Sequence, residues 1–414
     1  MSGHPLAPWR TAMRARDRSE QHRVSTPLEL LFDLCFVVAV SQAAAQLHDA
    51  LRDDRLGPGL LGYAMVFFAI WWAWMNFTWF ASAYDTDDVP YRLLTLLQMA
   101  GVLVLAAGVP AALTHYDFTV ITIGYVIMRV AMIGQWIRAA AEDPPGRPAA
   151  LRYAVGIAVV QIGWVARLAL PYPWDRIGFA VLVVAEMAVP AWAERGGRQT
   201  SWHPGHIPER YGGFTIIVLG EVILATLVGV QAVTGDHGVS ASLLMIAIGA
   251  LILVFALWWI YFTAGEVALE TLRTALLWGY GHYFVFAAIA AIGAGLDTAL
   301  NVAERSAQVP ETDAAFTVAV PVAVVFAVLA VLHRITGTGT GLRVWAGCAG
   351  AVGVLAVASA TGGLGLGGAV LGIGLVAAVV LTVSLVTTTG RRGVAVIARE
   401  SVSGWGIGHE GGGR

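Results

Sequence analysis

Acidic residues inside apolar segments are the feature of this sequence most able to do chemistry. Glu29 and Asp33 lie near the start of one segment long enough to cross a bilayer, and Glu221 lies near the middle of another. A charged side chain at the centre of a membrane helix costs about 2.5–3.5 kcal/mol on insertion scales, so each carboxylate needs a partner or a task. Acids at this depth bind protons or cations in transporters, which is the chemistry that the sequence indicates first.

Glu29 has a structural explanation in its local sequence. Thr26 precedes it by three residues and Pro27 follows Thr26, so the stretch matches a capping box with proline at the first helical position. In such a box the carboxylate accepts a hydrogen bond from the backbone N–H of the capping residue. We therefore expect Glu29 to stabilise the start of a helix, and a place in an ion pathway is the alternative.

Asp33 and Glu221 lie too deep to cap a helix. Asp33 is one turn beyond Glu29 on the same face, and two hypotheses explain it: it lines a polar interior for a cation or proton, or it forms a buried ion pair with Arg129 or Arg167. Glu221 shares a helix face with Arg210 and lies near the bilayer midplane. Because transporters place coupling sites at that depth, a functional role is favoured for Glu221.

Other polar residues have weaker claims to a site. Asp85, Asp87 and Asp88 follow an aromatic segment and either form a solvated loop or attract cations to a pore mouth. Glu186 is a further acid inside an apolar segment. His282 lies among aromatic residues without a His-x-x-x-His motif or a cysteine cluster, so we expect a hydrogen-bonded core residue and no metal site.

The composition defines the class of protein. Hydrophobic residues make up 57% of the 414 residues and charged residues only 13%, with a mean hydropathy of +0.71. Soluble domains carry about 25% charged residues, so the chain is a membrane protein. No basic face suited to nucleic acid is apparent. The sequence contains no lysine, and a Walker-type phosphate loop, which requires one, is therefore excluded.

Twelve apolar stretches have the length that a helix needs to cross about 30 Å of hydrocarbon. The predicted spans are 27–47, 59–80, 92–113, 118–139, 151–170, 176–193, 208–230, 240–262, 274–296, 314–334, 342–360 and 365–387. If the N-terminus is cytoplasmic, 19 arginines fall on the cytoplasmic side and 4 on the outer side. This bias predicts that both termini are cytoplasmic and that loops 48–58 and 297–313 face outward.

The two halves of the chain repeat the same ordered features. A proline opens each half at Pro27 and Pro208, paired tryptophans end the second span of each, and Arg92 and Arg273 open the third. Copies separated by six spans share one orientation, as in transporters built from parallel repeats. The predicted organisation is a tail at 1–25, a six-helix repeat at 26–193, a cytoplasmic linker at 194–207, a second repeat at 208–390 and a tail at 391–414.

Three motifs in the right order carry a family resemblance. They are TPLELLFDLCFV at 26–37, YDTDD at 84–88 and ERYGGFTIIVLGE at 209–221. With them the chain resembles the bacterial low temperature requirement protein A (LtrA) family over roughly residues 23–390. The resemblance implies a multi-pass protein of the bacterial inner membrane that is needed for growth at low temperature, without an agreed biochemical activity.

Together these features predict a secondary transporter or ion-conducting protein. The expectation rests on the intramembrane acids, the repeat and the lack of a soluble catalytic domain. We expect no enzymatic activity and no cofactor, because no nucleophile with a paired base is recognisable. The expected partners are the lipid bilayer and a small solute or ion. The alternatives are a membrane-embedded enzyme acting on lipid and a structural component of a membrane complex.

Overall fold

All the regular secondary structure in the described part of the chain is α-helical. The computed structural model describes residues 9–18, 20, 23–53, 55–196, 199–234, 240–263, 267, 269–304 and 306–403, without the side chains of 232–234 and of 388–403. Twelve helices within these ranges are long and apolar enough to cross a membrane, as predicted. They are α1 (Pro27–Arg52), α2 (Leu56–Tyr84), α3 (Val89–His115), α4 (Thr119–Glu142), α5 (Arg147–Arg167), α6 (Trp174–Ala193), α7 (His206–Thr234), α8 (Ala241–Phe262), α9 (Leu272–Ala303), α10 (Glu311–Thr336), α11 (Gly341–Ser359) and α12 (Thr361–Ser403).

Short polar sequences fix where several helices begin and end. The Asp88 carboxylate accepts the backbone N–H of Tyr91 at 3.0 Å and caps α3. Thr340 caps α11 in the same way, accepting the N–H of Arg343 at 3.2 Å. Gly337 follows α10 with φ at +67°, a left-handed conformation that glycine adopts without steric strain. The local sequence therefore encodes these boundaries.

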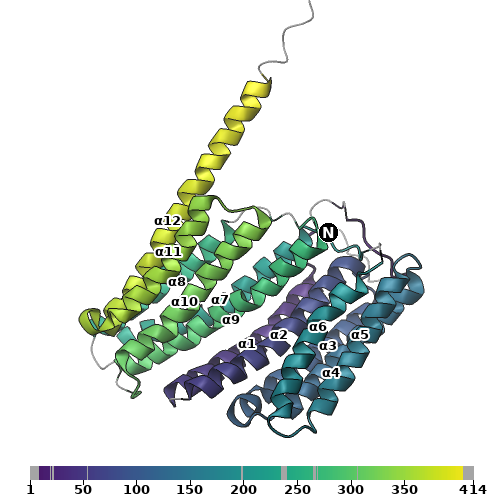
Figure 1. The fold of residues 1–414 in the computed structure, drawn as a ribbon, viewed down its shortest axis with the longest axis horizontal. Coiled ribbons are helices and arrows are strands. Elements are labelled where there is room, and N and C mark those ends of the chain that lie inside the picture. The colour runs from purple at the N-terminus through teal and green to yellow at the C-terminus, as the bar shows by residue number, and fades with distance from the viewer. Residues whose placement is uncertain are drawn as a thin grey trace, which may run out of the picture.

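Helices α1–α6 and α7–α12 form two groups that meet along α1, α2, α7 and α9 (Figure 1). Within the groups, α3 packs most extensively on α4, α9 on α10 and α8 on α12. Two reciprocal hydrogen bonds join the groups. The Tyr63 hydroxyl of α2 donates to the carbonyl oxygen of Ala287 at 2.7 Å, and the Tyr283 hydroxyl of α9 donates to that of Ala64 at 2.9 Å. The hydroxyls of Tyr63 and Tyr283 thus tie α2 to α9.

The last helix is longer than its predicted span. Its membrane-spanning part runs from Thr361 to Thr387, close to the predicted 365–387, but the helix continues to Ser403. The predicted tail at 391–414 is therefore helical over its first part, and residues 404–414 lie outside the described residues. The arginines at 391 and 392 end the apolar stretch, but arginine is a good helix former and does not end the helix.

The paired tryptophans of the two halves lie in different surroundings. Trp71 and Trp72 are 1% and 0% exposed, whereas Trp258 and Trp259 are 47% and 48% exposed. Helix α2 packs against α7 and α9 of the other half, while α8 packs mainly on α12, which leaves its tryptophans at the surface. Most of the aromatic residues from Phe67 to Phe80 are accordingly buried in the core of the bundle.

Glycines allow α8 and α12 to approach closely. A Cβ added at Gly374 would lie 2.5 Å from the carbonyl oxygen of Gly249, and one at Gly367 would lie 2.6 Å from that of Ser242. The more obvious small-residue motif, Gly368-x-x-x-Gly372, does not form this contact. A Cβ at Gly368 would meet only Leu364 of its own helix, at 3.3 Å.

This difference predicts opposite outcomes for two glycine substitutions in one helix. Gly374→Ala should lower the stability of the purified protein by about 1–3 kcal/mol, because α12 must move away from α8 to relieve the clash. Gly368→Ala should be neutral or stabilising by up to about 1 kcal/mol, since alanine is the better helix former. Thermal unfolding in one detergent measures both, and equal melting temperatures for the two variants would contradict the packing described.

Candidate functional site

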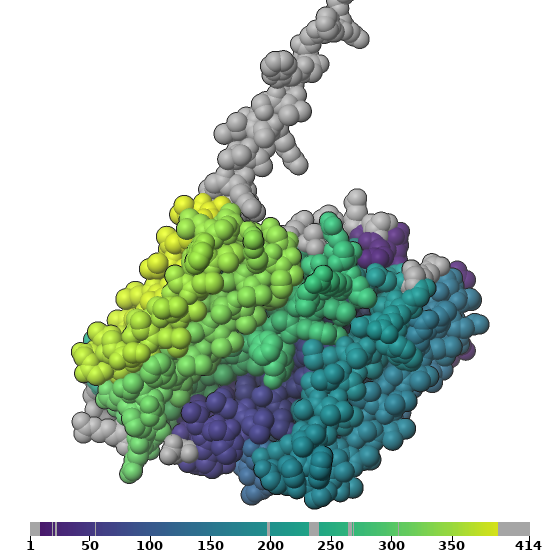
Figure 2. Space-filling view, in the orientation of Figure 1, coloured from purple at the N-terminus to yellow at the C-terminus, as the bar shows by residue number. Residues whose placement is uncertain are grey.

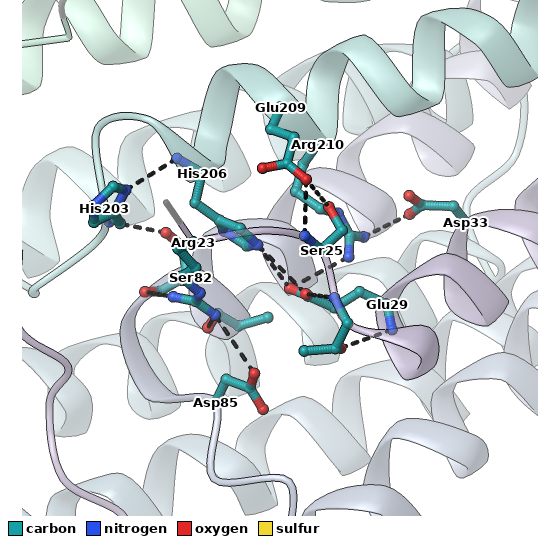
Figure 3. A network of polar contacts seen from close by, with 12 residues as sticks. Arg23, Ser25, Glu29, Asp33, Ser82, Asp85, His203, His206, Glu209 and Arg210 are labelled. Atoms are coloured by element: carbon teal, nitrogen blue, oxygen red, sulfur yellow. Dashed lines mark hydrogen bonds and ion pairs between the residues drawn. The ribbon is translucent and has the colours of Figure 1, made fainter. Parts of the chain in front are cut away.

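Helices α1 and α7 begin side by side, and their first turns hold a group of buried charges (Figure 3). The backbone N–H of Thr26 donates to the Glu29 carboxylate at 2.8 Å, and the N–H of Glu29 donates to the Thr26 hydroxyl at 3.3 Å. This confirms the predicted capping box. Glu29 does more than cap α1, because its carboxylate also lies 3.3 Å from His206 Nε2 of α7.

Arg210 of α7 is the cation that neutralises the acids of α1. Its guanidinium lies 2.5 Å from the Asp33 carboxylate and 3.3 Å from that of Glu29. The Trp74 indole N–H donates to the same Asp33 oxygen at 2.7 Å. Arg210 is 0% exposed, and both acids are 1% exposed. The group is therefore a buried ion-pair cluster that joins the two halves of the protein.

The predicted partners of Asp33, Arg129 and Arg167, were wrong. Arg129 lies 3.4 Å from Glu186, and the Arg167 guanidinium lies over the rings of Phe118 and Phe179. The prediction considered only arginines inside spans, whereas Arg210 lies in the first turns of α7 and had been counted with the cytoplasmic segments. The close approach of α1 to α7, which a single sequence does not reveal, decides the pairing.

Glu186 is the centre of a second buried cluster, within the first half of the chain. Its carboxylate accepts the Trp72 indole N–H at 2.8 Å, the Tyr125 hydroxyl at 3.0 Å and the Trp164 indole N–H at 3.1 Å. Arg129 completes the group at 3.4 Å. Three neutral donors and one cation satisfy this acid, and the arrangement is that of a structural ion pair.

The charged cluster continues beyond the first turns of α1 and α7. Ser25 donates its backbone N–H to the Glu209 carboxylate at 2.8 Å, and Asp85 lies 3.6 Å from both Arg16 and Arg23. Burial raises the pKa of Asp85 to about 6, and the nearby Glu29 carboxylate adds to this shift while the two arginines oppose it. The predicted candidate Asp85 thus belongs to a buried pairing network and not to a solvated loop.

The other two acids of that loop are also paired. Asp87 forms an exposed ion pair with Arg92 at 2.8 Å. Asp88 lies 2.6 Å from Arg138 and caps α3. Burial opposes the ionisation of Asp88, but hydrogen bonds from Arg138 and from two backbone N–H groups outweigh it and lower its pKa to about 2. Each loop acid therefore has an arginine partner, which leaves little negative charge to attract cations.

Glu221 differs from the acids described above. It is half-buried, and its carboxylate is hydrogen-bonded to the Ser41 hydroxyl of α1. Among the described residues, no arginine or histidine forms an ion pair with it. A Cβ added at Gly293 of α9 would lie 3.1 Å from the Glu221 Cβ, so a glycine makes room for this acid. Glu221 lies where α7 packs against α1 and α9, next to Ser41 and Gly293.

His282 is a hydrogen-bonded core residue, as predicted. Its Nδ1 lies 2.8 Å from the carbonyl oxygen of Trp278 and its Nε2 lies 3.1 Å from the Tyr261 hydroxyl. The ring is 1% exposed and packs against the Trp278 indole. Both ring nitrogens are therefore occupied, and the structure does not bring His282 together with Asp33 or Glu221.

Two titratable residues within the membrane-spanning helices were missed in the sequence. His48 and Asp297 fall in the loops predicted at 48–58 and 297–313, but α1 continues to Arg52 and α9 to Ala303. Both residues therefore lie inside membrane-spanning helices. No proline or glycine interrupts the sequence after either predicted end until the true end of the helix, and this continuity was the available signal.

The fold and these clusters define a class of protein. Twelve membrane-spanning helices, with carboxylates and arginines paired between them, form a polytopic membrane protein. The family described as Bacterial low temperature requirement A protein (LtrA) matches residues 24–387, and the chain belongs to this family. It is also similar to a protein of Rhizobium meliloti (strain 1021) described as uncharacterized protein RA0937. The two are 28% identical over 308 residues, which cover 69% of this chain and 71% of the relative.

The shared cation of the α1–α7 cluster leads to a prediction about protein stability. Arg210→Met leaves Glu29 and Asp33 buried without their cation, so we expect a loss of about 3–5 kcal/mol and a low membrane abundance. Asp33→Asn should cost less, about 1.5–3 kcal/mol, because Arg210 keeps Glu29 as a partner. Immunoblotting of membranes and thermal unfolding measure the two effects.

Arg92→Met is the matched control, because it removes an arginine from an exposed ion pair, with side-chain exposures of 45% for Arg92 and 47% for Asp87. Exposed pairs contribute only about 0–1 kcal/mol, so this variant should reach normal abundance. If Arg210→Met accumulated as well as Arg92→Met, the cluster would not hold the two halves together.

Proposed function

We propose that the protein is a secondary transporter or ion-conducting protein in which Glu221 binds the coupling proton or cation. One observation carries the proposal: Glu221 is a membrane carboxylate whose charge no described arginine or histidine balances, whereas Asp33 and Glu186 each have an arginine. An acid at this depth is stable when a proton or a cation occupies it. Such an acid, located where two halves of a protein meet, suits alternating access.

The two ends of the interface between the halves differ. At the end where α1 and α7 begin, Arg210, Glu29 and Asp33 join the halves. At the other end, a cavity of about 830 Å³ lies between the α1–α2 turn and the start of α10. Figure 2 shows α1, in purple, at the boundary where the first half meets the green surface of the second half. We take the structure to be a state of the transporter in which the interface between the halves is closed at the charged end and open at the cavity.

The proposal includes the arrangement of the protein in the membrane. The halves act as parallel six-helix repeats in the inner membrane, with both termini cytoplasmic and the cavity facing outward. The arginine bias and the order of the repeated motifs support this. The neighbours of the helices agree with a repeat, since α1 packs on α2 and α3 as α7 packs on α8 and α9. The proposal assigns no chemical reaction to the chain.

The proposed orientation has a direct test. A reporter fused after Arg414 should show cytoplasmic activity, and a reporter inserted in the α1–α2 turn at Asp53 should show periplasmic activity, because most arginines flank the cytoplasmic ends. Paired alkaline phosphatase and fluorescent protein fusions measure this. Periplasmic activity at Arg414 would reverse the assignment of the cavity to the outer face.

The functional role of Glu221 is tested with a substitution that keeps its size. Glu221→Gln should reach normal membrane abundance, because no described cation loses its partner, and it should abolish growth in the cold when it replaces the wild-type protein. Vesicles that contain only the purified protein should show uptake or current for some member of a panel of ions and solutes, and Glu221→Gln should remove that signal.

Asp33→Asn serves as the comparison, because it changes a carboxylate that has a structural partner. Its loss of function should follow its loss of abundance, whereas Glu221→Gln should lose function alone. If Glu221→Gln supported normal growth and normal flux, the proposed role would be wrong. Release of modified lipid from vesicles by the wild-type protein, without flux, would favour the membrane-enzyme alternative.

A further inference from the structure

Polar side chains continue from Glu221 toward the end of the bundle where the cavity lies. Ser41, the partner of Glu221, is followed seven residues later on α1 by His48. Residues seven apart lie on nearly the same helix face, about 10 Å apart along the axis. Helix α9 packs against α1 and α7. Its Asp297 and Asn301 are four residues apart on one face, and Asn301 contacts His48 of α1.

His48 is held by two side chains of α9. Its Nε2 lies 3.0 Å from the Asn301 amide nitrogen, and its Nδ1 lies 3.5 Å from the Thr298 hydroxyl. With the amide nitrogen donating, Nε2 is an acceptor and Nδ1 carries the hydrogen of the neutral imidazole. A flip of the Asn301 amide would present its oxygen instead and accommodate a proton on Nε2. This contact therefore accommodates either protonation state of His48.

Asp297 lies on one face of α9 between the two contacts, four residues after Gly293, which packs against Glu221, and four residues before Asn301, which contacts His48. The charges of His48 and Glu221 both act on its carboxyl. It is half-buried, and among the described residues no side chain donates a hydrogen bond to it. The other titratable group near Glu221 is Tyr63 of α2, whose hydroxyl donates to a backbone carbonyl. In the described parts of α8, α10 and α12, no charged group interacts with Asp297.

The ligands available here suit a proton better than a metal cation. Sodium sites in transporters use carbonyl oxygens from unwound helix segments, but α1, α7 and α9 are continuous at these residues, so their carbonyls take part in helical hydrogen bonds. Imidazole nitrogens are also poor ligands for alkali and alkaline-earth ions. Among the described residues, no group of three His, Cys, Asp or Glu side chains is placed to hold a metal ion.

We propose that the ion bound by Glu221 is the proton, and that it travels between Glu221 and the cavity end by way of Asp297 and His48. This inference rests on the proposed function and names its coupling ion. A hydronium ion gives its proton to Nε2 of neutral His48 and leaves as water. The imidazolium passes one proton to the Asp297 carboxylate and returns to the neutral form. Asp297 then gives its proton to the Glu221 carboxylate, so that one proton moves inward and no charge accumulates on the route.

Proton flux into vesicles tests the route. The purified full-length protein is reconstituted with a trapped pH dye, and an inward proton gradient is imposed while valinomycin and potassium fix the membrane potential. Wild type should acidify the interior, and Glu221→Gln should not. Asp297→Asn and His48→Gln should each retain less than about a tenth of the wild-type rate, and Asp297→Glu, which keeps a titratable group, should retain most of it.

His115→Gln is the matched control, since His115 ends α3 at the cavity end of the bundle but is exposed and lies outside the three helices that carry the route. It should conduct protons at the wild-type rate. Gel filtration and a thermal melt confirm that every variant is folded before its flux is compared.

The same vesicles separate the two proposals when sodium and rubidium tracers are added. Alkali-ion flux without proton flux would overturn the proton assignment and leave the transport function standing. Wild-type proton flux in folded Asp297→Asn and His48→Gln would overturn the route. A folded wild-type protein that moves no member of the panel of ions and solutes, protons and alkali ions included, would overturn both the inference and the proposed function.

Discussion

The pairing of Arg210 with Glu29 and Asp33 is the contact on which the arrangement of the two halves depends. Three charged side chains are withdrawn from water, at a desolvation cost of several kcal/mol per ion. Their mutual attraction offsets this cost only while α1 and α7 stay in register. Two carboxylates face one guanidinium, and the imidazole of His206 supplies a further polar contact to Glu29 at 3.3 Å. The cluster therefore fixes how the first turns of the two halves meet.

The cluster also helps to separate the acids within the helices by whether an arginine balances their charge. Asp33 and Glu186 are assigned to arginines, whereas Glu221 of α7 and Asp297 of the adjacent α9 form no ion pair with an arginine among the described residues. A charge in a membrane must be balanced by a partner or by a bound ion. The presence of an arginine beside the carboxylate therefore separates Asp33 and Glu186 from Glu221 and Asp297. Depth in the membrane alone does not separate them.

Much of the fold and part of the candidate site could be predicted from the sequence, because these features depend on local sequence. Span positions follow from hydropathy, the capping box from three residues, and the core role of His282 from its aromatic neighbours and the lack of other ligands. The partner of Asp33 could not be predicted, since it depends on which helices are adjacent. His48 and Asp297 were missed because span ends were placed where hydropathy falls, while helices continue until a residue stops them. The contact of Gly374 with α8 likewise depends on helix adjacency.

Helix α7 connects the charged cluster to the proposed ion site in a rigid way. Arg210 and Glu221 lie on one continuous helix, about 16 Å apart along its axis. Both contact α1, through Asp33 and through Ser41 respectively. A movement of α7 along α1 therefore displaces both contacts together. In the proposed mechanism, opening the charged end therefore changes the surroundings of Glu221, and occupation of Glu221 changes the stability of the charged end. Two contacts between the same two helices are sufficient to couple a gate to an ion site, since free-energy coupling between sites is reciprocal.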